Sequence, residues 1–210
     1  MREQSKKNKK AWEYRAYEYW NNQGIPAEKA MYLKSDPIAR LRYHQKYFQN
    51  IKGLKIANPC GSNGRIAVPL ALLGAEVTIF DISEENKRYA LELSECAGVN
   101  IQYIVGDFYD VDMNLYSDYF DIIYAEGGIL HYFSDIDLFT NNLCKITKKN
   151  GKLILSDFHP FRKINQNSNA SQTCGNYFDS NVHKGDVAYK GFFPEEDTDT
   201  FPIVLYGFTH

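Results

Sequence analysis

A loop of small residues separates the first strand-like run from the helical stretch that follows it. Residues 58–65 read Asn-Pro-Cys-Gly-Ser-Asn-Gly-Arg. Gly61 and Gly64 have no side chain to keep a ligand from the backbone, and the free N–H groups at a helix start favour a carboxylate or phosphate. The same Gly-x-x-Gly spacing also suits an ordinary tight turn, so the loop indicates a ligand site only together with its neighbours.

Two carboxylates follow at the ends of the next two strand-like runs. Asp81 closes the second run, 20 positions after Gly61, and Asp107 with Phe108 closes the third. Adjacent parallel strands would bring both carboxylates to one sheet edge, where Asp81 could accept both ribose hydroxyls and Asp107 an adenine amino group. The alternatives are a charge that stabilises the next helix for Asp81 and a turn residue for Asp107.

The elements that must position these residues alternate between short apolar runs and helical stretches, from Leu54 to Asp157. This pattern predicts a parallel sheet flanked by helices. The five predicted strands are Leu54–Asn58, Glu76–Phe80, Ile101–Val105, Phe120–Ala125 and Lys152–Ser156. Three helices are expected between them: one from Ser83 to Gly98, one that starts within Ser134–Asp137, and one that contains Pro69 and ends at Gly74.

The N-terminal flank, residues 1–50, is predicted to be a helical cap. Residues 6–22 form one helix in this prediction, with Tyr14, Tyr17 and Trp20 largely on one side. Such a helix could fold over a ligand, and its rings would suit a cation. The alternative is an aromatic stripe packed against the core.

The C-terminal flank, residues 161–210, follows a predicted core of residues 51–160. Phe161–Asp186 is polar and without period, which is typical of a loop or lid. Val187–Phe193 and Phe201–Phe208 are strand-like and could pair as a hairpin across the intervening turn at Pro194–Thr200.

Composition excludes several classes of protein. A chain of 210 residues with 44% hydrophobic and 24% charged residues is expected to fold as one globular domain, and its formal charge of −2 provides no basic field for nucleic acid. The longest apolar run, Ile66–Ala75, is too short for a membrane span, and a secretory signal is missing, so we expect a cytoplasmic protein. The four cysteines lie at least 30 positions apart, without the close pairs of a zinc site.

These segments together resemble the class I S-adenosylmethionine-dependent methyltransferases, particularly the branch that acts on small molecules. The resemblance runs from about Trp12 to His159 and rests on residues 58–65, 75–83, 105–108, 120–124 and 150–155. It implies a Rossmann-like, doubly wound, mainly parallel α/β sheet with strand order 3-2-1-4-5, an N-terminal capping helix, and a C-terminal lid or edge hairpin.

The resemblance also implies a cofactor, S-adenosylmethionine, with S-adenosylhomocysteine as product and a small molecule as methyl acceptor. The glycine-rich loop would border the methionine part, Asp81 would hold the ribose, Ile82 would pack on adenine, and Asp107 with the Phe108 backbone would read adenine. The expected cofactor-binding residues are Asn58, Cys60, Gly61, Ser62, Gly64, Asp81, Ile82, Asp107, Phe108, Glu126, Gly127, Tyr17 and Trp20.

The chain departs from the family pattern at two positions near the methionine end. Ala57 stands where the family usually has an acidic residue, and Pro59 stands where it usually has a glycine. Our hypothesis is that Asn58 compensates for the missing acid.

The segment Ala125–Phe133 after the fourth strand should lie near the reacting atoms. Its polar candidates for catalysis are Glu126 and His131, and His159 follows the fifth strand. Methyl transfer needs in-line positioning more than acid catalysis, and a base serves only a poorly ionised acceptor. Either histidine could be that base, or could have a structural role only.

The sequence is also compatible with two other functions. A nicotinamide-dependent oxidoreductase would share the acid after the second strand but usually has Gly-x-Gly-x-x-Gly after the first, a pattern that this chain lacks. A non-catalytic nucleoside-binding or assembly protein is the other alternative. Because residues 161–210 show no further helix and strand pair of the family kind, the fifth strand could expose an edge, which a second subunit in a homodimer would cover.

Overall fold

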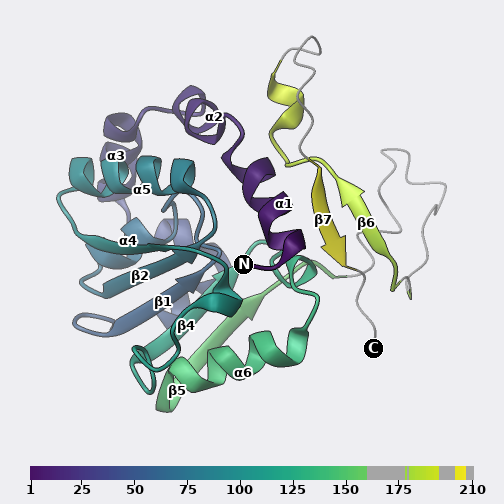
Figure 1. The fold of residues 1–210 in the computed structure, drawn as a ribbon. Coiled ribbons are helices and arrows are strands. Elements are labelled where there is room, and N and C mark those ends of the chain that lie inside the picture. Colours follow the sequence, from purple (N-terminus) through teal and green to yellow (C-terminus); the bar gives the residue numbers. More distant parts are fainter. Residues whose placement is uncertain (160–177, 179, 194–201, 207–210) are drawn as a thin grey trace.

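The centre of the computed structural model, which describes residues 1–159, 178, 180–193 and 202–206, is a parallel five-stranded sheet. The strand order β3-β2-β1-β4-β5 confirms the predicted order (Figure 1). The strands are β1 (Lys55–Pro59), β2 (Glu76–Asp81), β3 (Ile101–Val105), β4 (Phe120–Glu126) and β5 (Thr147–Ser156). Only β5 differs much from its predicted bounds, since it begins at Thr147 rather than Lys152 and pairs with Phe120 across a register shift.

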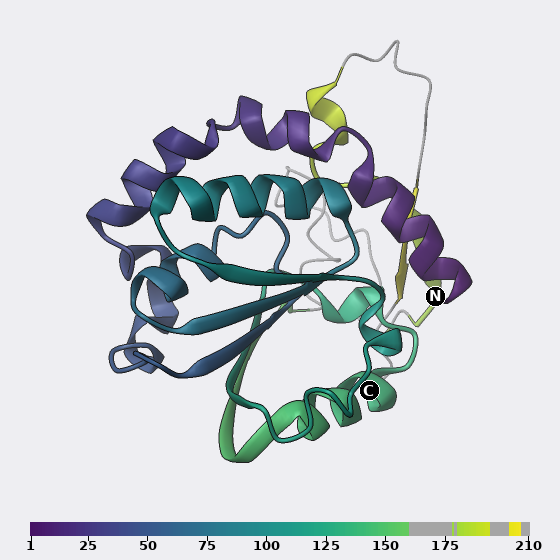
Figure 2. The same ribbon diagram turned by 60° about the vertical axis from the view of Figure 1, so that its left-hand side comes forward.

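Helices cover both faces of this sheet. Figure 2 shows α5 (Glu84–Ala97) on one face and α6 (Ile136–Ile146) on the other, and α4 (Ala67–Leu72) packs on the α5 side. Alternate residues of β4 are buried on opposite faces: Ile122 and Tyr124 in the core with α4 and α5, and Ile123 in the core with α6. Burial on two faces explains why the strands read as continuous apolar runs.

The helix boundaries follow local capping chemistry. Ser83 caps α5, because its Oγ accepts a hydrogen bond from Asn86 N at 3.1 Å, and Gly98 ends it with a φ of 73°. The cap of α6 is Asp135, whose Oδ1 accepts from Leu138 N at 2.9 Å. Both helix starts were predicted from the sequence.

The N-terminal segment is not the single helix that the pattern over residues 6–22 predicted. It forms α1 (Glu3–Glu13) and α2 (Ala16–Asn22), with a break at Arg15, whose φ is 51°. Two further helical elements, α3 (Pro26–Ser35) and a 3-10 segment (Ala39–Tyr47), lie within the predicted helical cap, although neither was predicted individually. Because Arg15 adopts a left-handed conformation, the chain turns between α1 and α2, and the axes of the two helices point in different directions (Figure 1).

The C-terminal residues form a separate two-stranded antiparallel sheet of β6 (Val182–Gly185) and β7 (Ile203–Tyr206). The prediction of a strand over Val187–Phe193 is wrong: this segment turns, and Lys190–Phe192 is a short 3-10 helix. Its apolar side chains, including Tyr189 and Phe193, are buried in a cluster with Ala11 of α1, so burial rather than strand pairing explains their pattern. The prediction of a loop or lid over Phe161–Asp186 is wrong at its end, because Val182–Gly185 pairs with β7 as a strand. Most of its other residues, and the Pro194–Thr200 turn, lie outside the described residues.

The small sheet lies beside α1 rather than along β5 (Figure 1). The chain therefore brings α1 and β7 together next to the carboxyl ends of the parallel strands. Among the described residues, no helix has both the length and the apolar character to span a membrane.

Candidate cofactor site

The carboxyl ends of the parallel strands open into a cavity of about 270 Å³. Segments that follow β1, β2, β3 and β4 line its floor, and α1, α2 and the chain at Tyr189 line its cover. Most of the predicted cofactor-binding residues line it: Cys60, Ser62, Asp81, Ile82, Asp107, Phe108, Glu126, Gly127 and Trp20. The strand order brings these residues together, because β3, β2, β1 and β4 are successive neighbours in the sheet.

Asp81 lies at the end of β2 and is 9% exposed. Its two carboxylate oxygens accept hydrogen bonds from Ser62 N and Ser83 N, each at 3.0 Å. Burial raises the pKa of this carboxyl, against the opposing effect of the backbone N–H groups. Asp81 thus joins the loop after β1 to the start of α5 at the cavity wall.

Asp107 has a different environment at the end of β3. Its Oδ1 accepts from Tyr109 N at 3.1 Å, whereas its buried Oδ2 has no hydrogen-bond partner among the described residues. An unpaired buried carboxylate oxygen is costly, and a donor on a ligand in the cavity would satisfy it. Phe108 beside it is buried and packs edge-on against Phe80, with ring centroids 5.7 Å apart.

The loop after β1 follows a strained path that brings its backbone to the cavity. Cys60 and Ser62 have φ values of 53° and 50°, and Gly64 has a φ of 77°. Tyr103 steadies the loop, because its OH donates to Ser62 O at 2.9 Å. Burial is the main cause that raises the pKa of the Cys60 thiol well above its usual value, so Cys60 is a protonated wall residue rather than a nucleophile.

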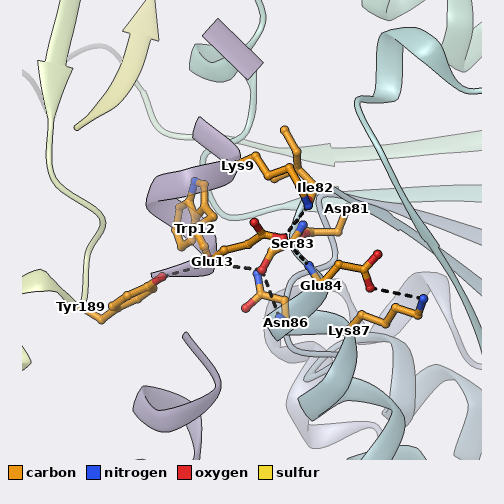
Figure 3. Close-up of polar contacts among 10 residues, drawn as sticks. All are labelled: Lys9, Trp12, Glu13, Asp81, Ile82, Ser83, Glu84, Asn86, Lys87 and Tyr189. Carbon is orange, nitrogen blue, oxygen red and sulfur yellow. Dashed lines mark hydrogen bonds and ion pairs between the residues drawn. The ribbon is translucent and has the colours of Figure 1, made fainter. Parts of the chain in front are cut away.

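The N-terminal helix is fastened over the start of α5 (Figure 3). Lys9 Nζ donates to Ile82 O at 2.9 Å, and Ser83 Oγ donates to Trp12 O at 3.1 Å. Glu13 accepts from the backbone N–H of the first α5 residue at 3.1 Å, where a negative charge is favourable. Trp12 is thereby held at the cavity wall.

The C-terminal segment fastens the same helix from its other side. Tyr189 OH donates to Trp12 O at 3.1 Å (Figure 3). Asn8 of α1 pairs with the backbone of Val204 in β7, donating to its carbonyl at 3.1 Å and accepting from its N–H at 2.6 Å. Both Asn8 and Tyr189 line the cavity, so residues from both ends of the chain complete its cover.

Glu126 is the last residue of β4 and lines the cavity together with Gly127 and Gly128, which follow it. Its Oε2 accepts from Tyr124 OH at 2.9 Å, and His44 Nδ1 lies 2.8 Å from the same hydroxyl. Of the three predicted catalytic residues, Glu126 alone lines the cavity.

The structure places the other two predicted catalytic residues and Tyr17 outside the cavity lining. His131 stacks against Phe158, with ring centroids 6.2 Å apart, and His159 is exposed. Tyr17 packs edge-on against Tyr89 on α5 and hydrogen-bonds with the Glu92 carboxylate.

Three predicted loop and strand residues support the cavity from beneath. Asn58 is 2% exposed and its Nδ2 donates to Tyr124 O at 2.8 Å, so it ties β1 to β4 instead of reaching the cavity. A Cβ at Gly61 would lie 2.5 Å from Asn58 Oδ1, and one at Gly64 would lie 2.9 Å from Ala90 Cβ. Both glycines are needed for packing.

Sequence reasoning missed six cavity residues from the flanks, namely Ser5, Asn8, Trp12, Tyr19, Ala188 and Tyr189. The aromatic-rich N-terminal stretch is a signal for Trp12 and Tyr19. Asn8 and Tyr189 have no local signal, because their positions depend on contact between the two ends of the chain.

Comparison with known proteins identifies the family. A family model described as a methyltransferase domain matches residues 56–192, which is more than half of the chain. The chain belongs to the class I S-adenosylmethionine-dependent methyltransferase family. The chain shares its fold with an S-adenosylmethionine-dependent methyltransferase from Mesorhizobium loti of known structure, with a TM-score of 0.58 and 20% identity over 79% of this chain and 74% of that one.

Curated relatives of this methyltransferase include two ubiquinone biosynthesis O-methyltransferases. The protein from Pelagibacter ubique is 31% identical over 127 residues, which are 60% of this chain and 50% of the relative. The protein from Rickettsia conorii is 29% identical over 119 residues, which are 57% of this chain and 40% of the relative. The chain thus spans about half the length of these relatives.

Proposed function

We propose that this methyltransferase transfers a methyl group from S-adenosylmethionine to a small molecule. The observation that carries the proposal is Asp107, which lines the cavity and whose buried Oδ2 has no hydrogen-bond partner among the described residues. Asp81 lies at the neighbouring strand end and lines the same cavity. Two such carboxylates suit the amino group of adenine and the hydroxyls of ribose.

The remaining cavity residues suit the rest of the cofactor. When bound, S-adenosylmethionine supplies a methyl group that its sulfonium makes electrophilic. Ile82 and Phe108 offer apolar contact to a base, and the backbone of Ser62 borders the expected methionine end. Trp12, Trp20 and Tyr19 line the cover, where rings favour a cation.

The role of the protein in the reaction is then mainly positioning and exclusion of water. Aligning reactants can contribute about 7–11 kcal/mol in favourable cases. Where the acceptor needs to lose a proton, Glu126 is the predicted catalytic residue that lies at the cavity, and its Tyr124 partner sets its orientation. The names of the curated relatives, O-methyltransferases, favour a hydroxyl oxygen as the acceptor atom.

The proposal is tested by melting the pure protein with S-adenosylmethionine, S-adenosylhomocysteine or NAD. A ligand that binds the native state at 100 times its Kd adds about 2.7 kcal/mol of stability, so the two sulfur compounds should raise the melting temperature and NAD should not. Stabilisation by NAD alone would overturn the proposal. Tight binding with no S-adenosylhomocysteine formed from a panel of hydroxylated small molecules would favour the non-catalytic alternative.

A further inference from the structure

Glu126 is connected through Tyr124 to a histidine that lies outside the cavity. Tyr124 and Glu126 are two positions apart in β4, so their side chains lie on the same face of the sheet. Tyr124 OH donates to Glu126 Oε2 at 2.9 Å, and His44 Nδ1 lies 2.8 Å from the same hydroxyl. The direct distance from His44 Nδ1 to Glu126 Oε2 is 3.8 Å, so Tyr124 is the link between the two side chains.

The 3-10 segment before β1 brings His44 to this position. Leu41 and Phe48, on either side of His44 in the sequence, are buried in the same core as Tyr124. The Phe48 and Tyr124 rings pack with their centroids 4.8 Å apart, and the His44 ring lies edge-on to Tyr124 at 5.6 Å. His44 itself is partly exposed, with 22% of its side chain accessible. The contacts therefore run from the protein surface to the cavity.

Of these three side chains, Glu126 alone lines the cofactor cavity. A second cavity adjoins the first, and its walls include Arg40 and Arg65. Neither His44 nor Tyr124 lines that second cavity. Both residues therefore act on a ligand in these cavities through Glu126 and not by direct contact.

Tyr124 keeps its hydrogen in this environment. Burial, followed by the negative charge of Glu126, raises the pKa of the Tyr124 hydroxyl, against the opposing charges of Arg40 and Arg65. A neutral hydroxyl has one hydrogen to donate and lone pairs with which to accept. Because that hydrogen goes to Glu126 Oε2, the hydrogen bond between Tyr124 and His44 must be donated by His44 Nδ1. The chain thus has one direction, from His44 through Tyr124 to Glu126.

Two donors in series favour the ionised form of Glu126. A hydroxyl that accepts a hydrogen bond from an imidazole N–H becomes a stronger donor itself, because hydrogen bonds in a chain polarise one another. A donor fixed in a buried core also holds the carboxylate in one orientation at the cavity. An ionised and oriented carboxylate is the form that can take a proton from a neutral hydroxyl acceptor.

We propose that His44 is a positioning residue that, through Tyr124, holds Glu126 as an oriented carboxylate for the proton of a neutral hydroxyl acceptor. The inference rests on the proposed function of methyl transfer. In that step the acceptor oxygen forms a bond to the methyl carbon, and the carbon–sulfur bond breaks with its electron pair left on sulfur. The acceptor proton passes to Glu126, which later releases it to solvent.

The first experiment reads the tautomer of neutral His44 from the nitrogen-15 NMR signals of its ring, and it needs no ligand. The wild-type protein should have the hydrogen on Nδ1, because the hydrogen bond of a ring nitrogen sets the tautomer. Tyr124→Phe removes the partner of Nδ1, and Glu126→Ala frees the Tyr124 hydrogen to turn toward Nδ1. In both variants the hydrogen should move to Nε2. Tyr47→Phe is the matched control, because the exposed Tyr47 ring also neighbours His44, at 6.5 Å, and this variant should keep the hydrogen on Nδ1.

The second experiment compares His44→Leu with His44→Gln, whose side-chain amide can still donate to Tyr124. Initial rates of S-adenosylhomocysteine formation are measured with the panel of hydroxylated small molecules. His44→Leu and Tyr124→Phe should lower kcat about tenfold or more, the effect of losing one hydrogen bond in a chain to a charged group, and should leave KM nearly unchanged. His44→Gln should recover most of this loss, and Tyr47→Phe should lose nothing. Circular dichroism melts show that each variant is folded, and the pair at the partly exposed His44 gives a comparison independent of the buried Tyr124.

Calorimetry tests the other task open to Glu126, which is to bind the ammonium group of the cofactor. The ligands are S-adenosylhomocysteine and 5′-methylthioadenosine, which has no ammonium group. Unchanged affinities of Tyr124→Phe for both ligands support the inference, whereas a loss for S-adenosylhomocysteine alone assigns Glu126 to the cofactor and overturns it.

Two further results would overturn the inference: a wild-type His44 with its hydrogen on Nε2, or a His44→Gln variant as slow as His44→Leu. A wild-type protein that methylates no member of the panel contradicts the proposed function instead. In that case the tautomers of His44 still decide whether His44 acts on Glu126 through Tyr124.

Discussion

Asp81 and Asp107 are the same residue type at neighbouring strand ends, yet their surroundings give them different tasks. Both oxygens of Asp81 accept hydrogen bonds from backbone N–H groups, so this side chain fixes the loop and the helix start that form the site and also lines the cavity. Asp107 uses one oxygen to cap the turn after β3 and keeps the other buried and unpaired within the described structure. A substitution of Asp107 is therefore the better test of which ligand binds, because the Asp107 side chain can be changed with less damage to the loop after β1.

We predict that Asp107→Asn weakens S-adenosylhomocysteine binding by about tenfold or more. The variant can keep the acceptor for Tyr109 N but replaces the free oxygen with an NH₂ group, which meets the adenine amino group donor to donor. Calorimetry should show the loss for S-adenosylhomocysteine, and a smaller one for S-inosylhomocysteine, which has a carbonyl in place of that amino group. Equal losses for the two ligands would mean that Asp107 does not read the base.

At the level of elements, the loop after β1 must fit between the sheet and α5. Gly64 closes this loop with a φ of 77° and lies against Ala90 of α5. Position 64 therefore requires glycine for two reasons: its backbone has a positive φ, and a Cβ there would press against α5. Gly98 at the end of α5 shares the first requirement, with a φ of 73°, but an added Cβ there would meet nothing within 4 Å.

This pair of glycines makes the two effects separable. Gly98→Ala should lower the free energy of unfolding by about 1–2 kcal/mol, the cost of a left-handed alanine. Gly64→Ala should cost clearly more, because its Cβ would lie 2.9 Å from Ala90 Cβ and 3.2 Å from Ala90 Cα, neither of which is the end of a flexible side chain. Urea unfolding measures both values, and equal costs would contradict the packing argument.

At the scale of the whole molecule, the N-terminal helix α1 meets the C-terminal segments at Tyr189 and β7 to cover the cavity. Asn8 and Val204 are 196 positions apart and share two buried hydrogen bonds. Tyr189 adds a bond to the backbone of α1. The cover is thus held by polar contacts between remote segments, whereas the sheet beneath is held by its own ladders and two apolar cores. The cover should open more readily than the sheet.

Asn8→Ala tests whether the cover opens independently of the sheet. The change leaves the buried N–H of Val204 without its partner, at a cost of about 1–3 kcal/mol. Hydrogen exchange should speed up in α1 and β7 but not in β1 or β4, and S-adenosylhomocysteine should dissociate faster. Lys10→Ala, at an exposed position on the same helix, is the control and should change neither. A uniform loss of protection would show that cover and core unfold together.

Much of the fold and the floor of the site could be predicted from short stretches of sequence. The alternation of apolar runs predicted all five strands, Ser83 and Gly98 predicted α5, and the acids at strand ends predicted the carboxylates of the cavity. These signals are local, since strand periodicity, capping and turn chemistry each depend on a few neighbouring residues. The family resemblance supplied the strand order, which local pattern leaves open.

The cover of the cavity was decided by tertiary structure. The break at Arg15 interrupts a helix that the local pattern favours. The segment Val187–Phe193 does not form the predicted strand, because its apolar side chains are buried against α1 instead. Arg40 and Arg65 are 25 positions apart, and only the packing of the 3-10 segment against the loop after β1 brings both to the walls of one cavity. The physical reason is the same in each case: the free energy that places these residues comes from contacts between segments far apart in the chain.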